Sequence, residues 1–574
     1  MRILVLTLAS LLLTACQPSA PEQAATSAAK PDEPSAAPAE MSAHVSGPEI
    51  SGEDFAEHVR ILSSDEFAGR APGTVGEEKT VAYLEQQFKR LGLKPGNGDS
   101  YRQTVPMVAS KVGKDTRLTL HFADGDETLA FGSQMVVGTT TGQPQVSLDR
   151  SELVFLGYGV KAPEVGWDDY SIDVKGKTLV VLVNDPGFHV GDESLFQGRR
   201  MTYYGRWSYK YEEAARQGAA AVLIIHDDAG AGYGWDVVEN SWSGEQYDLP
   251  YRESDPPRLP VQGWITAEVA DRMFNRLGLS LNDLRTAANQ RGFKPVPLEV
   301  SASTVLNTQT HEASSDNVLA VLPGSERPDE LVVYMGHWDH LGTNPDLEGD
   351  QIFNGAIDNA TGIAGILEIA EAFVTQAEPP KRSVMFLAVT LEESGLLGSK
   401  YYASNPVYPL DQTVAAINLD AMHLPGPTRD MVVIGLGNSE LEDILKPIAE
   451  KQGRVLRAES GLEKGFFYRS DHFSFAKAGV PALYAKSGVE HVEKGAEFGE
   501  AWGARYIAES YHKPADEFDP NWQLGGVVQD LEALYQVGHK LAAGDQWPNW
   551  YPGNEFRALR DAALAARSEP DSND

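Results

Sequence analysis

The chain has 574 residues, with 82 acidic and 48 basic side chains and a formal net charge of −34. This charge argues against nucleic acid as a partner, because neutralising phosphates requires a basic surface. Cys16 is the only cysteine, so no disulfide can form within the chain, and the length exceeds one ordinary hydrophobic core, so we expect two folded units.

The first 16 residues have the layout of an export signal. Arg2 gives a positive start, an apolar run follows from Ile3 to Leu13, and Leu13-Thr14-Ala15-Cys16 resembles a lipobox. The apolar run is too short to span a bilayer. We therefore interpret Cys16 as the acylated first residue of an exported protein, lipid-anchored in a bacterial cell envelope. An ordinary signal peptide is the alternative, and Gln17 favours the outer membrane, at its periplasmic or surface face.

Residues 17–48 are rich in alanine, proline, serine and glutamate and contain no aromatic residue. Such a segment buries too little apolar surface to offset its ordering entropy, so a disordered tether is predicted. Within the C-terminal tail, 547–574, the residues from Ser568 onward are expected to be disordered as well. The aromatic segment QWPNWYPGNEF is expected to pack on its own domain, with an interface or a lid as alternatives.

Residues 49–146 are expected to form the first part of a catalytic domain. The spacing of apolar residues predicts helices between Phe55 and Leu93. Between them lies the loop DEFAGRAPGT, which either approaches the active site or only connects the helices. Short alternating runs from Thr116 to Val146 predict β-strands.

Residues 147–296 are predicted to form an inserted β-rich domain. The runs SELVFLGYG, KTLVVLVND and AAAVLIIHD have the composition of strands, and YKYEEAARQG has that of a helix. His189 and His226 have no partner at the spacing of metal ligands, so both are interpreted as structural.

Residues 297–546 show the pattern of an α/β domain. Strands that are apolar throughout, such as LVVYMG and RSVMFLAVT, alternate with helices such as NATGIAGILEIAEAFVTQ. This pattern predicts a mixed, mostly parallel sheet flanked by helices. Ligands of such sheets bind outside the carboxyl ends of the strands, where His337, Glu392, Glu393 and Asp420 lie.

These polar residues suit a two-metal hydrolase site, because imidazole and carboxylate groups are zinc ligands. Asp358 lies in a glycine-containing turn, and the two oxygens of its carboxylate can bridge two metals. His337 and Asp420 would complete the site of one metal. Glu393 and a second histidine would complete the other.

Three further groups would finish the site. The second histidine is either His512, in SYHKPADEFD, or His472, in RSDHFSF, and the residue types leave this choice open. Glu392 is the first of two adjacent glutamates at a strand end, where neighbouring side chains point in different directions. It is therefore predicted to act as the general base toward the water between the metals. Asp339 is expected to accept the remaining ring N–H of His337.

Six segments resemble the zinc aminopeptidases of peptidase family M28: GHWDHLG, NGAIDNATG, TLEESGLLGS, INLDAM, YRSDHFSFAKAGVPAL and SYHKPADEFD. The resemblance extends from about residue 52 to about residue 546. It is interrupted by 147–296, which resembles a protease-associated (PA) domain. The resemblance implies a zinc-peptidase-like α/β fold, two Zn²⁺ ions and peptide substrates.

The resemblance also implies a role for each residue of the site. The implied metal ligands are His337 and Asp420 for one zinc, Glu393 and His512 for the other, and Asp358 for both. Glu392 would be the general base and later the proton donor, and Asp339 would support the ligands. Tyr511 would stabilise the tetrahedral oxyanion, and Arg469 would lie near the substrate.

We therefore expect an exported di-zinc metallo-aminopeptidase that removes N-terminal residues from peptides. Three alternatives stay open: a carboxypeptidase or other amide hydrolase on the same fold, a single-zinc enzyme like glutaminyl cyclase, and a non-catalytic binding protein. The last is disfavoured because no ligand of the implied set is missing. The sequence does not give the oligomeric state or the preferred N-terminal residue.

Overall fold

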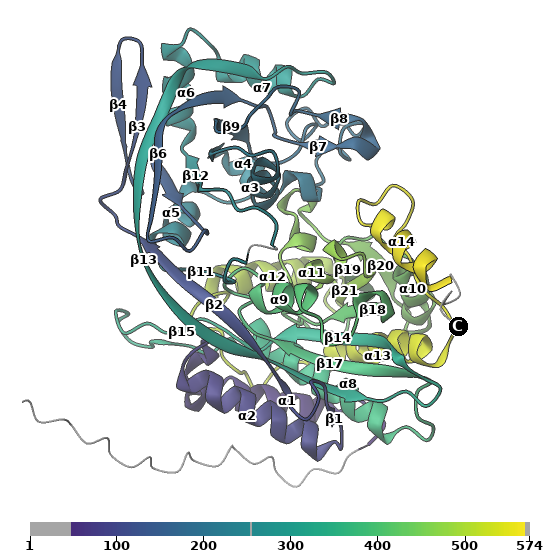
Figure 1. Ribbon diagram of the computed structural model, residues 1–574. Helices are drawn as coiled ribbons and strands as arrows, with labels where there is room; N and C mark the ends of the chain where they lie inside the picture. The colour runs from purple at the N-terminus through teal and green to yellow at the C-terminus, as the bar shows by residue number, and fades with distance from the viewer. Residues whose placement is uncertain (1–46, 253–254, 569–574) are drawn as a thin grey trace, which may run out of the picture. The chain divides into compact units, whose positions relative to one another are not determined.

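The structure, a computed structural model, describes residues 47–252 and 255–568 (Figure 1). The predicted export signal, Cys16 and the tether up to residue 46 lie outside the described residues, as do residues 569–574 of the tail. These predictions therefore stay predictions. Within the described part of the chain, no helix is both long enough and apolar enough to cross a membrane.

A mixed sheet with a parallel centre forms the core of the α/β part of the chain. Its parallel strands are β17 (Arg382–Val389), β14 (Arg327–His337), β18 (Thr413–Asn418) and β21 (Ala482–Ser487). On one side β13 (Val296–Leu322) pairs with β17, and β1 (Lys94–Pro95) pairs with β13. On the other side β19 (Asp430–Val433) pairs with β21, and β20 (Val455–Ala458) pairs with β19. Every residue of β17, β18 and β21 is buried, as expected for strands covered on both faces.

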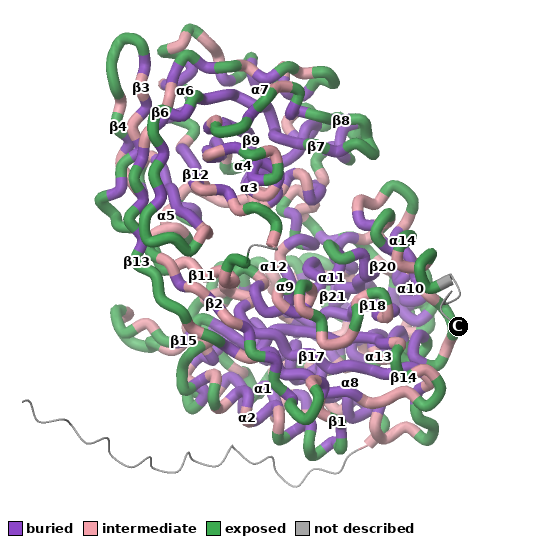
Figure 2. The backbone as a smooth tube through the Cα atoms, in the orientation of Figure 1, coloured by how far each residue is buried: buried purple, intermediate pink, exposed green. Residues whose placement is uncertain are grey.

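Helices cover both faces of this sheet, whose central strands are coloured as buried in Figure 2. Two separate hydrophobic cores lie between the helices and the sheet. One core contains Val332 and Tyr334 and is covered by α1 (Gly52–Leu62), α2 (Val75–Arg90), α8 (Thr361–Thr375), α10 (Leu441–Lys451) and α13 (Gly525–Ala543). The other contains Val333 and Met335 and is covered by α9 (Leu397–Ser404) and α11 (His472–Lys477). Successive side chains of a strand point to opposite faces, so β14 contributes to both cores. The predicted α/β fold is confirmed.

A second sheet includes the strands expected in the insertion. Its order is β4 (Gly125–Ala130), β3 (Arg117–Phe122), β13, β6 (Gln145–Phe155), β9 (Thr178–Leu182), β10 (Ala221–Ile225), β12 (Val261–Ile265) and β5 (Met135–Gly138). One face is covered by α3 (Trp207–Arg216) and α5 (Trp235–Ser243), the other by α6 (Ala267–Arg276) and α7 (Leu281–Ala288). The sheet therefore uses β3, β4 and β5, which precede residue 147.

Strand β13 takes part in both sheets and is 27 residues long (Figure 1). Its first part pairs with β3 and β6 of the second sheet. Its later part pairs with β2 (Arg102–Val112) and then with β17 of the first sheet. The short strand β11 (Gln246–Asp248) adds to the far edge of β2. Backbone hydrogen bonds along β13 therefore link the two sheets directly.

The aromatic segment of the tail packs on its own domain, as expected. Trp550 is fully buried and donates its indole N–H to the carbonyl of Gly479, 3.0 Å away. The final helix, α14 (Arg557–Ser568), follows. Its Arg560 donates to the carbonyls of Thr413 and Val414 at the start of β18, at 3.0 and 2.8 Å. These contacts hold the tail against the amino-terminal end of β18.

Helix α13 approaches β14 closely because Gly538 has no side chain. A Cβ atom there would lie 1.9 Å from the hydroxyl oxygen of Tyr334, which donates to Leu534 O at 2.9 Å. We expect Gly538→Ala to lower the free energy of unfolding by about 1–3 kcal/mol through overpacking. In an open helix interior the same change would instead be favourable by about 1 kcal/mol.

Chemical unfolding of the purified protein measures this difference. Gly503 in α12 (Ala496–Glu509) is the matched control, because no atom lies within 4 Å of a Cβ added there. Gly503→Ala should leave the stability unchanged or raise it. An unaltered unfolding midpoint for Gly538→Ala would contradict the packing argument.

Candidate active site

The first ligand group lies at the carboxyl end of β14. His337 is the last residue of that strand and is completely buried. Its Nε2 atom lies 3.2 Å from Asp358 Oδ1 and 3.6 Å from Asp420 Oδ1. This nitrogen has no hydrogen-bond partner among the described residues. A buried ring nitrogen that faces two carboxylates without a bond of its own is the arrangement that a metal ligand requires.

The second ligand group shares Asp358 with the first. His512 Nε2 lies 3.2 Å from Asp358 Oδ2 and 3.2 Å from Glu393 Oε2. The two oxygens of Asp358 thus face different histidines, and the expected ligands come together in two overlapping sets. His472 lies elsewhere, buried against the rings of Phe467 and Tyr484. Of the two candidate histidines, His512 rather than His472 is therefore the one that lies beside Asp358 and Glu393.

The turn that carries Asp358 is held by hydrogen bonds from several directions. The Asp516 carboxylate accepts the backbone N–H groups of Ile357 and Asp358, both at 3.1 Å. The side chain of Asn359 donates to the carbonyls of His337 and Leu419 at 3.3 and 3.1 Å. The Asp358–Asn359 peptide bond is cis. These contacts connect the Asp358 turn to the ends of β14 and β18.

Asp339 supports the site in a way that the sequence did not indicate. Its carboxylate accepts the backbone N–H groups of Glu392 and Glu393, at 3.2 and 3.4 Å. His337 Nδ1 lies 3.1 Å from the Asp339 carbonyl oxygen and 3.9 Å from the carboxylate. The expectation that the carboxylate accepts the ring N–H was wrong, because that carboxylate already binds the turn after β17.

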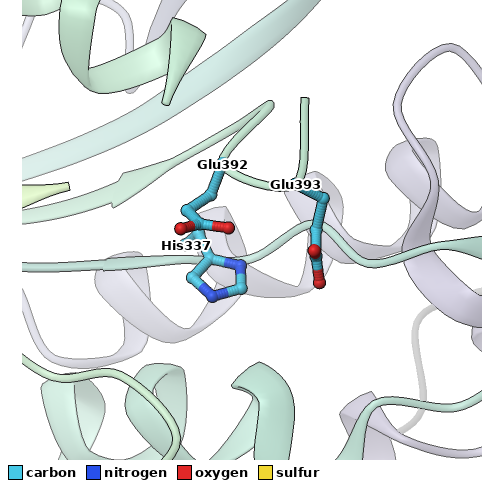
Figure 3. A group of neighbouring side chains, drawn as sticks. All are labelled: His337, Glu392 and Glu393. Carbon is cyan, nitrogen blue, oxygen red and sulfur yellow. The ribbon is translucent and has the colours of Figure 1, made fainter. Parts of the chain in front are cut away.

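Glu392 lies beside His337 and Glu393, and it takes no part in the contact between His337 and Asp358. Figure 3 shows its carboxylate close to the His337 ring, with the Glu393 carboxylate next to it. Burial, reinforced by the negative charge of Glu393 and Asp471, raises the pKa of Glu392 well above its usual value. A carboxylate with a raised pKa is suited to accept and release a proton near neutral pH.

His340 is part of the site, although we did not predict it. Its Nδ1 atom lies 2.7 Å from Glu393 Oε1, and its buried Nε2 atom has no hydrogen-bond partner among the described residues. Ligand atoms of His340, Asp358 and Glu393 all lie within 4.8 Å of one another. The segment GHWDHLG could have indicated this role, because His340 follows His337 there by three residues.

Tyr511 lies next to a ligand group, whereas Arg469 lies among aromatic rings. The Tyr511 ring stacks on His512 with 3.9 Å between the ring centroids. Burial, and then the negative charge of Asp358, raise the pKa of the Tyr511 hydroxyl, which therefore stays protonated. The Arg469 guanidinium lies 5.8 Å from the centre of the Tyr233 ring. Its Nε and Nη2 atoms have no hydrogen-bond partner within the described ranges.

The donor set fits zinc. It combines imidazole nitrogens with carboxylate oxygens, both of which zinc accepts, in a largely buried cluster with an excess of negative charge. Burial lowers the pKa of His337, but the charges of Glu392, Asp358 and Asp420 outweigh it and raise that pKa well above 6.5. Likewise, Glu393 and Asp358 outweigh burial and raise the pKa of His512 to about 9.

Known proteins resemble this chain most clearly in the part that holds the site. Residues 317–535 match the family model of peptidase family M28. A probable zinc metalloprotease of Pyrenophora teres f. teres is 37% identical over 196 residues, 32% of this chain and 35% of that protein. A probable leucine aminopeptidase 2 of Aspergillus oryzae is 25% identical over 488 residues, 82% of this chain and 80% of that protein.

A solved structure of similar extent is the aminopeptidase from Aneurinibacillus sp. strain AM-1. It has 19% sequence identity and a TM-score of 0.48, and the match covers 87% of this chain and 96% of that one. The coverage of relatives is uneven. The chain spans about a third of the length of the Pyrenophora metalloprotease but four-fifths of the length of the Aspergillus protein.

Zinc binding is expected to release protons. Nearby carboxylates raise the pKa of His337 well above 6.5 and that of His512 to about 9, so both imidazoles favour the protonated form in the metal-free protein and must lose a proton to bind metal. Titration calorimetry at pH 7.5, in two buffers of different ionisation enthalpy, should show proton release, and the release should fall as the pH rises through about 9. A binding heat independent of the buffer would contradict this assignment.

Proposed function

The chain belongs to peptidase family M28 and is a zinc-dependent metallopeptidase, and on this premise we propose that it is a di-zinc aminopeptidase that removes N-terminal residues from peptides. The observation that carries the proposal is the position of Asp358. Its two oxygens lie 3.2 Å from His337 Nε2 and 3.2 Å from His512 Nε2. A carboxylate placed in this way suits two metals at their usual separation of about 3.5–4 Å.

Each residue then has a defined task. Bound zinc would supply the Lewis acid that polarises the scissile carbonyl and acidifies a water molecule. Glu392 accepts a proton from the water as the water oxygen bonds to the scissile carbonyl carbon, and it transfers this proton to the amine nitrogen as the C–N bond breaks. Tyr511 donates a hydrogen bond from its protonated hydroxyl to the carbonyl oxygen as negative charge develops there. Asp339 and Asn359 hold the turns that orient these groups.

Relatives with aminopeptidase names support the substrate class. The Aspergillus oryzae protein, which this chain matches over four-fifths of its length, is a probable leucine aminopeptidase. The excess of carboxylates beside the ligand groups is also compatible with a positively charged N-terminus. A carboxypeptidase would instead need a cation for the C-terminal carboxylate, and Arg469 is the residue that keeps this alternative open.

The substitution Glu392→Gln tests the base assignment. It keeps the size of the side chain but removes the proton acceptor, so zinc content should be retained while kcat falls about 10²- to 10⁴-fold. Turnover of a leucyl peptide, with zinc measured by atomic spectrometry, checks both expectations. Glu378→Gln, in an exposed loop after α8, is the matched control and should behave as the wild type. Full activity of Glu392→Gln would exclude this residue as the base.

A substrate panel separates the two peptidase activities. An aminopeptidase should hydrolyse a free leucyl peptide and leave its N-acetylated counterpart intact. Release of the C-terminal residue from the N-acetylated peptide would instead establish the carboxypeptidase. Absence of both reactions in zinc-loaded protein would contradict the proposed function altogether.

We also propose that the protein is exported and anchored through Cys16, on the strength of the lipobox-like segment that ends there. Replacing the acyl acceptor by Cys16→Ser should move the protein out of the membrane fraction when the full chain is expressed in a bacterium. Immunoblotting of membrane and soluble fractions measures this shift. Ser19→Ala, three residues downstream, is the control and should stay with the membranes. An unchanged membrane fraction for Cys16→Ser would contradict the proposal that Cys16 carries a lipid anchor.

A further inference from the structure

Arg70 is a buried arginine that reaches the active site from the N-terminal part of the chain. It lies in the loop DEFAGRAPGT, outside the region 317–535 that matches the M28 family. Its side chain is 1% exposed. The guanidinium donates to four backbone carbonyls: Leu62 O at 2.8 Å, Trp338 O at 2.9 Å, Asn354 O at 2.7 Å and Gly355 O at 2.8 Å.

Three of these contacts are to residues that neighbour metal-ligand candidates in the sequence. Trp338 directly follows the ligand His337, whereas Asn354 and Gly355 lie just before the shared ligand Asp358. The guanidinium is planar and presents its N–H groups in a rigid fork. Carbonyls bound to one fork are therefore held at a set separation. The backbone of Arg70 adds a further link, since its carbonyl accepts the N–H of His340 at 3.3 Å.

The charge of Arg70 is also directed at the site. Its burial is compensated by the four carbonyl dipoles and by the charges of nearby carboxylates. Burial lowers its pKa to about 10, against the opposing effect of Asp516, Asp358, Asp339 and Glu393. The arginine stays positive. Two of these carboxylates, Asp358 and Glu393, are candidate metal ligands, and the other two hold the turns that carry the ligands.

The loop adopts an unfavourable backbone conformation to deliver this side chain. Ala68, Gly69 and Arg70 all have positive φ angles, of 47°, 67° and 50°, a region that residues with a Cβ atom seldom occupy. Gly69 also passes close to the backbone of Gly342, since a Cβ atom at Gly69 would lie 2.3 Å from Gly342 O. Such conformations persist where the surroundings require them and cluster at functional sites.

We propose that Arg70 is a positioning residue of the metal centre, which sets the separation of the His337 and Asp358 turns and thereby strengthens zinc binding. The N-terminal segment is then not only a connector between helices. It completes the support of a site whose ligands all come from later in the chain. The proposal rests on zinc binding at the site described above.

Two substitutions separate geometry from charge. Arg70→Lys keeps a positive charge but replaces the planar fork by a single ammonium group, and Arg70→Gln removes the charge as well. In both variants the zinc affinity of the metal-free full chain should fall about ten- to hundredfold, as for other residues that orient metal ligands. Competition with a chromophoric zinc chelator measures this affinity without relying on turnover.

Arg560 provides the matched control. It is equally buried and donates to the backbone carbonyls of Pro548, Thr413 and Val414 in the same domain, but no metal ligand contributes to its pKa. Arg560→Lys should lower the melting temperature and leave the zinc affinity unchanged. Circular dichroism of each metal-free variant establishes that it is folded before zinc is added.

Unchanged zinc affinity in folded Arg70→Lys and Arg70→Gln would overturn the proposal, and so would an equal loss in Arg560→Lys. An unfolded Arg70→Lys would assign the residue to the stability of the whole domain and would overturn the specific role as well. A wild-type protein that binds no zinc would contradict the di-zinc function on which the proposal rests, which is a different result from equal affinities.

Discussion

Repulsion among buried carboxylates is the constraint on which the peptidase site depends. Asp358, Asp420 and Glu393 converge on two histidines where the parallel strands end, and Glu392 lies beside them. Water cannot screen charges at this depth, so they must be balanced by cations or by hydrogen-bond donors. The raised pKa of His337 and the raised pKa of Glu392 are two results of the same imbalance, which bound metal ions would relieve.

A frame of hydrogen bonds holds these charges in place, and it acts mainly on the backbone of the ligand turns. Asp339 binds the N–H groups of the turn after β17, Asp516 binds those of the Asp358 turn, and Asn359 connects that turn to the ends of β14 and β18. Arg70 binds backbone carbonyls next to His337 and in the segment before Asp358. Because backbone groups are fixed by the strands, this frame places the ligands more rigidly than side-chain contacts alone could.

Several features of the site were open to prediction and others were not. The residue types after the apolar strands pointed to His337, Asp358, Glu393 and Asp420, which the structure brings together. The loop DEFAGRAPGT carried no such signal, since an arginine that binds carbonyls has no required neighbours in sequence. Arg70 and Asn354 are 284 residues apart, and only the packing of α1 and α2 against the sheet makes them neighbours.

The residue pattern was sufficient to predict the class of fold and most of the candidate ligands, because alternating apolar strands and helices favour a parallel sheet whose strand ends meet at one edge. The residue types left His512 and His472 open, and the choice of His512 came from the family resemblance. The folded chain supplies the physical difference between them: carboxylates surround His512, and aromatic rings surround His472. It also decided that the Asp339 carboxylate holds backbone and that His340 joins Glu393. Such roles depend on which groups of distant segments compete for one partner, and short-range pattern carries no record of that competition.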